Sequence, residues 1–297
     1  MLAGMLRRVL LFQAGMLGVF SITVTWLADL PWWAGWAFFV FFPMVVVWLW
    51  MVKITLHAGQ DRSSWTGILR ASVGEAFWVS RFFVLRLPWA SKAPHLLPAT
   101  SLPEGVGVVL VHGFVCNHRI WDDLAPYLRS RGHAVLALDL EPVFGSIDGY
   151  AAAIEQAARS LCLHTGKARV ALVGHSMGGL AIRAWMRAYG TDRVALAVTL
   201  GTPHQGTQVS PHARAPNGKQ MIWQSAWLAE LSATESPATR GLFRIAITPQ
   251  DAIVFPQREQ VLPGTPSHVF DGLGHVQLCS DTRVMHWVAE QLASARA

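Results

Sequence analysis

Residues 174–178 read Gly-His-Ser-Met-Gly and lie between an apolar run at 170–173 and a helix-compatible stretch at 178–189. In a G-x-S-x-G turn between a strand and a helix, the serine hydroxyl is exposed on a strained backbone. The small residues on either side let strand and helix approach closely, and the helix points its positive N-terminal end at a reacting carbonyl oxygen. Ser176 is therefore a candidate nucleophile for acyl transfer. A plain glycine-rich turn is the alternative.

A second glycine turn follows another apolar run and offers an oxyanion hole. Residues 110–114 read Leu-Val-His-Gly-Phe. Such a hole takes one backbone N–H from the residue after the nucleophile, here Met177, and one from a loop after an early strand, here Phe114. We expect His112 to brace this turn and not to transfer a proton.

From residue 105 onward, short apolar runs alternate with helical stretches. The runs are nearly continuous, as in a parallel sheet covered on both faces, and occupy residues 106–111, 134–140, 170–173, 194–200, 243–247 and 268–270. Helical stretches lie at residues 120–130, 150–162, 178–189 and 282–295. The pattern predicts an α/β fold with a doubly wound, mostly parallel sheet. An insertion at 203–241, with a short helix near 221–231, is a candidate lid.

Residues 105–292 resemble the α/β-hydrolase superfamily and, within it, the bacterial lipase and esterase group of the triacylglycerol lipase type. The resemblance rests on the His112-Gly113 turn, the G-H-S-M-G segment, and the run L-G-T-P-H-Q-G-T at 200–207, which is similar to the G-T-P-H-x-G-T segment of lipases. Residues 224–228, Gln-Ser-Ala-Trp-Leu, further resemble the start of the helical insertion in such enzymes. The sequence departs from secreted lipases in its long apolar N-terminal segment and in lacking an evident disulfide.

The resemblance implies a triad in the order serine, acid, histidine. Asp251 follows the run 243–247 and matches the family's acid, and His275 follows the last run and matches the family's base. The carboxylate would hold the imidazole in the tautomer that accepts the Ser176 proton. Asp271, four residues before His275, is the rival acid.

The insertion contains apolar residues in a region with no sheet strand to cover. We expect four of them to bind an acyl chain: Ile222, Trp223, Trp227 and Leu228. Packing of their short helix on the core is the alternative.

The remaining histidines and the cysteines do not indicate a metal site or a cofactor. The chain has 12 His and 3 Cys but neither an H-E-x-x-H nor a C-x-x-C motif. His175 is adjacent to Ser176 and should point elsewhere, and we expect His204 to be structural. We therefore expect no metal and no cofactor. Cysteines without an evident pairing scheme fit a reducing compartment.

The N-terminal third is the most apolar part of the chain. Residues 9–28 carry Gln13 as their one strongly polar side chain, and residues 31–52 carry no charge. About 20 apolar residues span the hydrocarbon core of a membrane as a helix, and the two residues between these stretches allow only a tight turn. Of the 14 Trp, nine precede residue 100, as in aromatic belts at membrane interfaces. This predicts a transmembrane helical hairpin at 1–52 in the lipid bilayer; a cleaved signal peptide or a pair of buried helices is the alternative.

Residues 53–104 link the hairpin to the catalytic domain, residues 105–297. Within them, residues 65–89 are rich in large apolar side chains interrupted by arginines and Glu75. Because Arg81 would lie in the middle of a span, we expect an interfacial helix; a helix packed on the catalytic domain is the alternative. Four prolines between residues 88 and 103 then mark a boundary.

The charges beside the two spans predict an orientation. Arg7 and Arg8 precede the first span and Lys53 and Arg62 follow the second, whereas the turn offers only Asp29. Lys and Arg near span ends favour the cytoplasmic side, so we expect the catalytic domain on the cytoplasmic face of a bacterial inner membrane. The rival arrangement has one span and an external catalytic domain.

These features together predict a membrane-anchored serine hydrolase of lipid or other acyl esters. Charged residues make up 14% of the chain, against about 25% in ordinary soluble domains, which excludes a disordered chain and a nucleic-acid-binding module. The net charge of +6 resides mostly in residues 1–100, beside the most apolar sequence, and favours an anionic lipid surface. An acyltransferase or thioesterase with the same triad and a non-catalytic membrane scaffold are the alternatives.

Overall fold

Six strands form one parallel sheet in the computed structural model, which describes residues 1–58, 65–90, 96–100, 105–209 and 211–295. The strands lie in the order β2-β1-β3-β4-β5-β6, and every neighbouring pair is parallel. Their bounds are β1 Gly107–Val111, β2 Val135–Ala137, β3 Val170–His175, β4 Val194–Leu200, β5 Phe243–Ile247 and β6 Ser267–Val269. The predicted doubly wound α/β sheet is confirmed.

Two strands differ by two or more residues in length from the runs that predict them. β2 ends at Ala137, because beyond it the chain bonds to a side chain: the backbone N–H of Leu140 donates to Nε2 of His112 (2.9 Å). β3 continues through Gly174 and His175, which pair with the end of β4. The longer β3 carries the chain to the carboxyl edge of the sheet immediately before Ser176.

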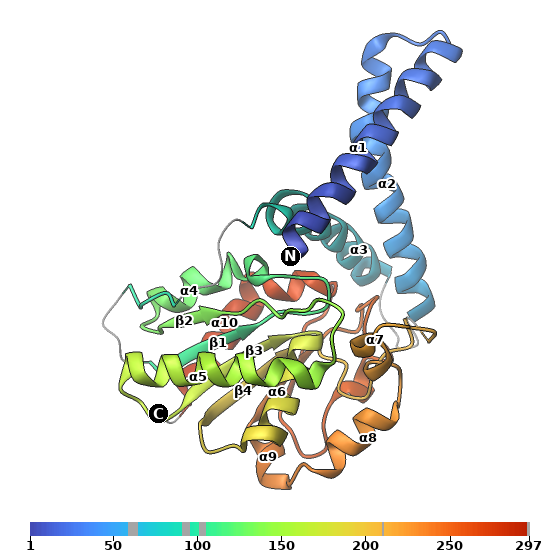
Figure 1. Cartoon of the computed structure of the whole chain (residues 1–297). Helices are drawn as coiled ribbons and strands as arrows, with labels where there is room; N and C mark the ends of the chain where they lie inside the picture. The colour runs from blue at the N-terminus through green and yellow to red at the C-terminus, as the bar shows by residue number, and fades with distance from the viewer. Residues whose placement is uncertain (59–64, 91–95, 101–104, 210, 296–297) are drawn as a thin grey trace.

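Helices cover both faces of the sheet. The covering helices are α4 Leu124–Ser130, α5 Ala151–Thr165, α6 Met177–Tyr189 and α10 Thr282–Ala293. Buried residues of α4 and α10, such as Leu128 and Val288, form one core with the sheet, and those of α5 and α6, such as Leu161 and Ile182, form a second. Figure 1 shows α5 and α6 in front of the strands and α10 behind them. We call residues 105–295 the sheet domain.

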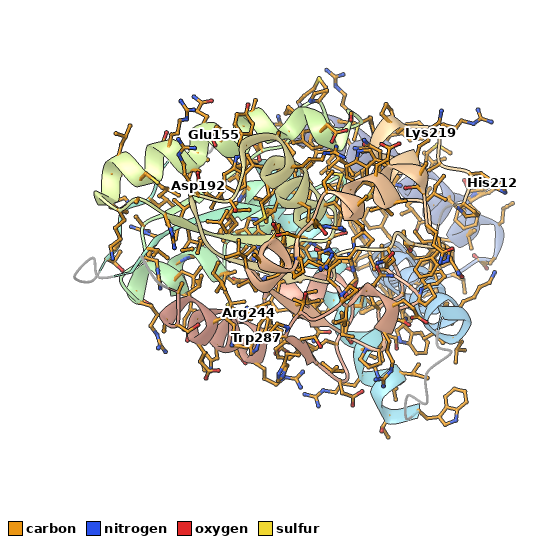
Figure 2. All side chains as sticks on the ribbon, turned by 90° about the horizontal axis from the view of Figure 1, so that it is seen from below. Glu155, Asp192, His212, Lys219, Arg244 and Trp287 are labelled. Atoms are coloured by element: carbon orange, nitrogen blue, oxygen red, sulfur yellow. The ribbon has the colours of Figure 1, made fainter. Side chains whose placement is uncertain are left out.

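The insertion between β4 and β5 contains three short helices, α7 Pro216–Gln220, α8 Ala226–Ala233 and α9 Pro237–Gly241. Short 3₁₀ turns complete the loops: η3 His118–Trp121, η4 Ile147–Tyr150, η5 Arg258–Gln260 and η6 Val276–Cys279. Seen from below, the exposed side chains of His212 and Lys219 mark the rim of the insertion (Figure 2).

The N-terminal helices α1 (Leu2–Leu27) and α2 (Trp32–Ala58) project from the sheet domain as an antiparallel hairpin (Figure 1). The hydroxyl of Ser21 donates to the carbonyl oxygen of Gly35 across the two helices. In the turn between them, Asp29 adopts a positive φ of 49°. The expected tight turn is therefore present, and the helices contact each other closely beside it.

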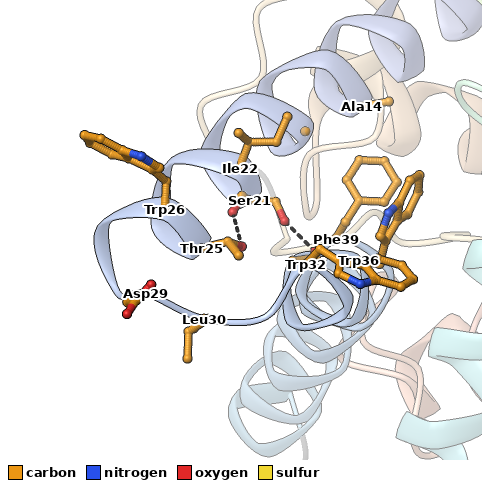
Figure 3. A pocket seen from close by; sticks show the side chains of 12 residues that line it. Ala14, Ser21, Ile22, Thr25, Trp26, Asp29, Leu30, Trp32, Trp36 and Phe39 are labelled. Atoms are coloured by element: carbon orange, nitrogen blue, oxygen red, sulfur yellow. Dashed lines mark hydrogen bonds between the residues drawn. The ribbon is translucent and has the colours of Figure 1, made fainter.

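The hairpin leaves most of its side chains outside any protein core. Of the 26 residues of α1, only Leu2 and Ser21 are buried, and α1 is long and apolar enough to cross a membrane. A hollow of about 700 Å³ lies between the helices near their turn, lined mainly by apolar side chains such as Trp32 and Trp36 (Figure 3). A signal sequence can be as long and as apolar as α1. Several side chains of α2 lie outside the described residues, and the two membrane spans therefore stay a prediction.

Helix α3 (Trp65–Ser80) continues as a π-helical turn, Arg81–Arg86, and a 3₁₀ turn, Leu87–Trp89. Its inner face packs on the sheet domain, with Ala71 1% and Phe82 0% exposed. In the structure, α3 is therefore a helix packed on the catalytic domain, which is the alternative that we gave to an interfacial helix. Arg62, Pro94 and Pro103, which entered the orientation and boundary predictions, lie outside the described residues.

The opposite face of α3 is apolar and exposed. Its members recur every four residues and so lie on one side of the helix; we call Trp65, Leu69, Val73 and Phe77 the outer stripe, and each is more than half exposed. Helix α3 therefore turns small and polar residues toward the protein and leaves its apolar outer stripe largely exposed.

Candidate active site

Ser176 is the single residue between β3 and α6. Its backbone adopts φ 54° and ψ −127°, a strained conformation for a residue with a side chain, at a cost of about 1–3 kcal/mol. Its N–H donates to the carbonyl oxygen of Leu200 on β4 (2.9 Å). A Cβ at Gly178 would collide with the Val111 carbonyl oxygen, so only glycine lets α6 begin this close to the end of β1. The predicted strand–serine–helix turn is present.

His275 and Asp251 form a buried pair beyond the ends of β6 and β5. Nδ1 of His275 lies 2.7 Å from Oδ2 of Asp251, and the two residues are 4% and 2% exposed. Oδ1 of Asp251 accepts the backbone N–H groups of Ile253 (2.8 Å) and Val254 (2.7 Å). These bonds fix the carboxylate, and the carboxylate fixes the imidazole with Nδ1 as the donor.

The surroundings of His275 favour its protonated form. Burial alone would lower the pKa of His275, but the charge and hydrogen bond of Asp251, with a smaller contribution from Glu75, outweigh burial and raise that pKa. The rival acid is elsewhere: Oδ1 of Asp271 accepts a hydrogen bond from Nε2 of Gln250 (2.7 Å). The structure therefore brings Asp251, and not Asp271, to the histidine.

The neighbour of Ser176 connects the serine turn to the histidine loop. Nε2 of His175 lies 3.1 Å from the carbonyl oxygen of His275, and the centroids of the two rings are 4.6 Å apart. Burial, followed by the charge of His275, lowers the pKa of His175 well below its ordinary value. Neutral His175 thus donates to the His275 backbone, and Ser176, His275 and Asp251 are gathered at one edge of the sheet.

The turn after β1 approaches Ser176 closely. A Cβ at Gly113 would lie 2.9 Å from Cβ of Ser176, so this position also requires glycine. His112 braces the turn, because its Nδ1 lies 2.8 Å from the Gly113 carbonyl oxygen while its Nε2 accepts from the loop after β2. Phe114 follows this turn and Met177 is the first residue of α6, so both lie beside the serine.

Residues 108–297 match the family described as alpha/beta hydrolase family. The chain belongs to the alpha/beta hydrolase family. The hydrolase is 33% identical over 128 residues to a triacylglycerol lipase of Burkholderia plantarii, covering 40% of this chain and 34% of that protein. It is 34% identical over 110 residues to a triacylglycerol lipase of Pseudarthrobacter phenanthrenivorans, covering 34% of each. The match thus spans about a third of the length of these curated relatives.

Solved structures of similar fold include lipases. The hydrolase aligns with mature Bacillus licheniformis lipase BlEst2 at a TM-score of 0.55 and 16% identity, covering 67% of this chain and 97% of that one. It aligns with Aspergillus fumigatus lipase B at a TM-score of 0.54 and 12% identity, covering 67% of this chain and 56% of that one. At these identities the likeness concerns the fold alone.

The insertion of this hydrolase is tied to α6 by a buried arginine. The Arg183 side chain is fully buried, and its Nε lies 2.6 Å from Oε1 of Glu235. Its other nitrogens donate to the carbonyl oxygen of His204 (2.9 Å) and to the hydroxyl of Ser232 (3.0 Å). His204 also contacts Oγ1 of Thr199 through its ring (3.0 Å), so His204 holds structure together, as the sequence analysis expects.

The four residues expected to bind an acyl chain have different surroundings. Leu228 is 2% exposed and belongs to the core beside α6. Nε1 of Trp227 donates to Oδ2 of Asp148 (2.9 Å), and the guanidinium of Arg187 lies 5.7 Å from its ring centroid. The packing alternative therefore describes Leu228, and Trp227 is held at the rim by polar partners.

Ile222 and Trp223 are partly buried and connect to the loop of the acid. Ile222 pairs with Thr207 in an isolated parallel bridge, and the N–H of Trp223 donates to the Thr207 carbonyl oxygen (3.1 Å). The Thr207 hydroxyl in turn donates to the carbonyl oxygen of Ile253 (2.5 Å). These two residues thus stay candidates for contact with a substrate.

The sequence did not indicate one residue that lies beside His275 in the structure. Glu75 of α3 is 2% exposed, and its carboxylate accepts the backbone N–H of Val276 (3.0 Å), the residue after His275. In the sequence, Glu75 is one of several charges that interrupt an apolar segment. The only available signal was that it lies on the face of α3 opposite the outer stripe.

Thiol and metal chemistry find little support in the described part of the chain. Burial raises the pKa of the Cys116 thiol to about 12 and raises that of Cys279 well above its ordinary value, so neither is a thiolate near neutral pH. Among the described residues, no group of three or more His, Cys, Asp and Glu side chains could hold a metal ion.

Proposed function

We propose that this chain is a membrane-anchored serine hydrolase that cleaves carboxylic esters through an acyl-enzyme. The observation that carries the proposal is the strained serine turn at the same sheet edge as the buried His275–Asp251 pair. A plain glycine-rich turn would have no need of an imidazole held by a carboxylate. The similar proteins from Burkholderia plantarii and Pseudarthrobacter phenanthrenivorans are both triacylglycerol lipases, which supports the same class.

The proposed reaction gives each group one role. Oγ of Ser176 attacks the ester carbonyl as Nε2 of His275 takes its proton, and Asp251 stabilises the imidazolium that forms. The N–H groups of Phe114 and Met177 donate to the oxyanion. His275 then gives the proton to the departing alcohol, and water, activated by the same imidazole, releases the acid and restores the serine.

Contacts at the base of the hairpin support the hypothesis that the substrate is apolar and comes from a membrane. The N–H of Leu2 in α1 donates to Oε1 of Glu141 (3.4 Å) in the loop after β2. Three residues further on, Phe144 contacts Phe114 of the oxyanion turn with ring centroids 5.8 Å apart, and both rings are partly exposed. A lipid ester near the first turn of α1 would therefore meet an aromatic surface beside the serine.

Labelling and kinetics test this function directly. Detergent-solubilised protein should react with a fluorophosphonate probe at Ser176 and hydrolyse p-nitrophenyl esters, with turnover rising from short to long acyl chains. Absence of labelling at Ser176 would favour the non-catalytic scaffold. Product analysis with an added alcohol distinguishes hydrolysis from acyl transfer, since a transferase forms a new ester.

The membrane part of the proposal has its own test. The two predicted spans and their flanking Arg7, Arg8 and Lys53 favour a catalytic domain in the cytoplasm. A reporter that fluoresces only in the cytoplasm, fused after the last residue, should fluoresce in the membrane fraction. A dark fusion, together with an active periplasmic phosphatase fusion at the same site, would reverse the orientation.

A further inference from the structure

The loop that carries His275 is held by a residue about 200 positions earlier in the chain. Both carboxylate oxygens of Glu75 accept the N–H of Val276, at 3.0 and 3.1 Å, and Oε2 also accepts the N–H of Gln277 (3.2 Å). These are the first N–H groups of η6, for which His275 is the preceding residue. The carboxylate thus binds the chain immediately beside the base.

Two glycines let α3 and this loop approach closely. A Cβ at Gly274 would lie 2.6 Å from Cβ of Glu75, and a Cβ at Gly74 would lie 2.9 Å from the amide carbon of Gln277. At Gly74 the clash is with the end of a flexible side chain, which can move aside, whereas at Gly274 it is with a Cβ that is fixed to the helix. The close contact of helix and loop therefore depends most on Gly274.

The carboxylate is buried, and no lysine or arginine among the described residues forms an ion pair with it. Glu75 is 2% exposed, and the titratable groups that face it are His275 and Asp251 of the triad and the Cys279 thiol of η6. Burial raises the pKa of Glu75 to about 7, partly offset by His275 and by the N–H donors. A buried charge costs free energy unless it is paired or hydrogen-bonded, so the imidazole is the cationic partner that this carboxylate has.

His275 is thereby fixed at three points. Its ring is held by Asp251 (2.7 Å) and its carbonyl oxygen by His175 (3.1 Å). Glu75 holds the following peptide unit. The first two contacts come from the sheet domain, and the third comes from the helix that follows the hairpin.

We propose that Glu75 is a positioning residue for His275: it fixes the backbone of the base and adds a second negative charge that favours the imidazolium. The proposal rests on the proposed function, because it needs His275 to be the base. The charge acts when His275 holds the serine proton, so its loss should reduce kcat more than it changes KM. The N-terminal segment is then part of the active site and more than an anchor.

Two substitutions in the full chain separate the roles of shape and charge. Glu75→Gln keeps an acceptor for the N–H groups but removes the charge, so the pKa of His275 should fall and the acid limb of kcat/KM should move to lower pH. Glu75→Ala also releases the loop, and should lower kcat about 100-fold with KM little changed. Glu155→Gln is the matched control, since Glu155 is 5% exposed and bonded to Trp185 in the opposite core; its acid limb should stay in place.

Glu75→Gln tests the proposal even if Glu75→Ala fails to fold. An acid limb of Glu75→Gln at the wild-type pH overturns the proposal, as does a loss of turnover expressed only in KM. Fluorophosphonate labelling of Ser176 in each variant reports that the site is assembled. If wild-type protein neither labels nor hydrolyses esters, the proposed function fails instead, before Glu75 is tested.

Discussion

The sheet domain and the hairpin are both rich in apolar residues, but they place them in opposite ways. Every residue of β3 is buried between helices, whereas 24 of the 26 residues of α1 are not buried. Exposing apolar surface to water costs about 25 cal/mol per Å². The sheet domain thus holds its apolar residues inside the protein, whereas the hairpin leaves most of its own on the surface, which supports the membrane anchor proposed above.

Helix α3 combines both arrangements. Its inner face supplies Phe82 to the core and Glu75 to the loop of His275, while its outer stripe faces away from the protein. The contrast teaches that apolar composition alone does not tell a membrane segment from a core segment. In α3, the exposed fraction of each residue is what separates the outer stripe from the face that packs on protein.

The largest expected effect tests whether the hairpin takes part in the chemistry. Ser176→Ala and His275→Ala should each lower ester turnover by about 10⁶-fold, because members of a triad act as a unit. Phe12→Ala, in the exposed part of α1, should leave turnover in detergent unchanged. Turnover of a soluble p-nitrophenyl ester measures all three, and a comparable loss in Phe12→Ala would break the division between the regions.

The next largest effect concerns the acid. Asp251→Asn should lower turnover about 10⁴-fold, because the asparagine amide stabilises the wrong tautomer of the imidazole. Asp271→Asn, which loses only charge beside Gln250, should retain most activity. Near-normal rates for Asp251→Asn with a loss in Asp271→Asn would overturn the assignment of the acid.

Two phenylalanines of neighbouring turns test the difference between the buried and the exposed face of the N-terminal segment. Phe82 is 0% exposed and Phe77 is 53% exposed. Phe82→Ala should lower the free energy of unfolding by about 3–5 kcal/mol, as truncation of a buried aromatic ring does. Phe77→Ala should change it by less than about 0.5 kcal/mol. Denaturant unfolding in detergent measures both, and equal losses would mean that the outer stripe packs on protein.

The smallest expected effect is a shift in pH dependence. His275 must be neutral to accept the serine proton, and Asp251 raises its pKa above the ordinary value. Activity should therefore be present at higher pH and fall as the pH drops through the raised pKa, with the acid limb of kcat/KM above about 6.5. A profile measured with a short-chain soluble ester gives this limb, and a value below about 6.5 would contradict the geometry of the pair.

Local patterns were sufficient to predict the strands and the serine turn. The runs at 194–200 and 243–247 coincide with β4 and β5, because buried parallel strands are continuous apolar runs. The strained joint at Ser176 follows from its flanking glycines. Even β6 lies within one residue of its predicted start, although its three residues are exposed.

Contacts between distant segments could not be predicted in this way. The two acids at 251 and 271 follow neighbouring strands, and only the side-chain directions show which one meets His275. The role of Leu228 in the core depends on where the insertion folds back onto α6. Glu75 meets its partner through a packing of α3 that the pattern of residues 65–89 did not predict, because the buried face of that helix consists of small and polar residues while its apolar stripe is exposed.

The bond between Glu75 and Val276 joins residues 201 positions apart, and this separation orders events during synthesis. Contacts between distant residues form late in folding, and domains assemble from the N-terminal side as the chain is made. The nascent chain therefore holds α3 and the serine turn while the loop that follows β6 is still absent. A chain that ends before β6 therefore lacks His275 beside Ser176, and this part of the sheet edge is completed only when the last segments have been made.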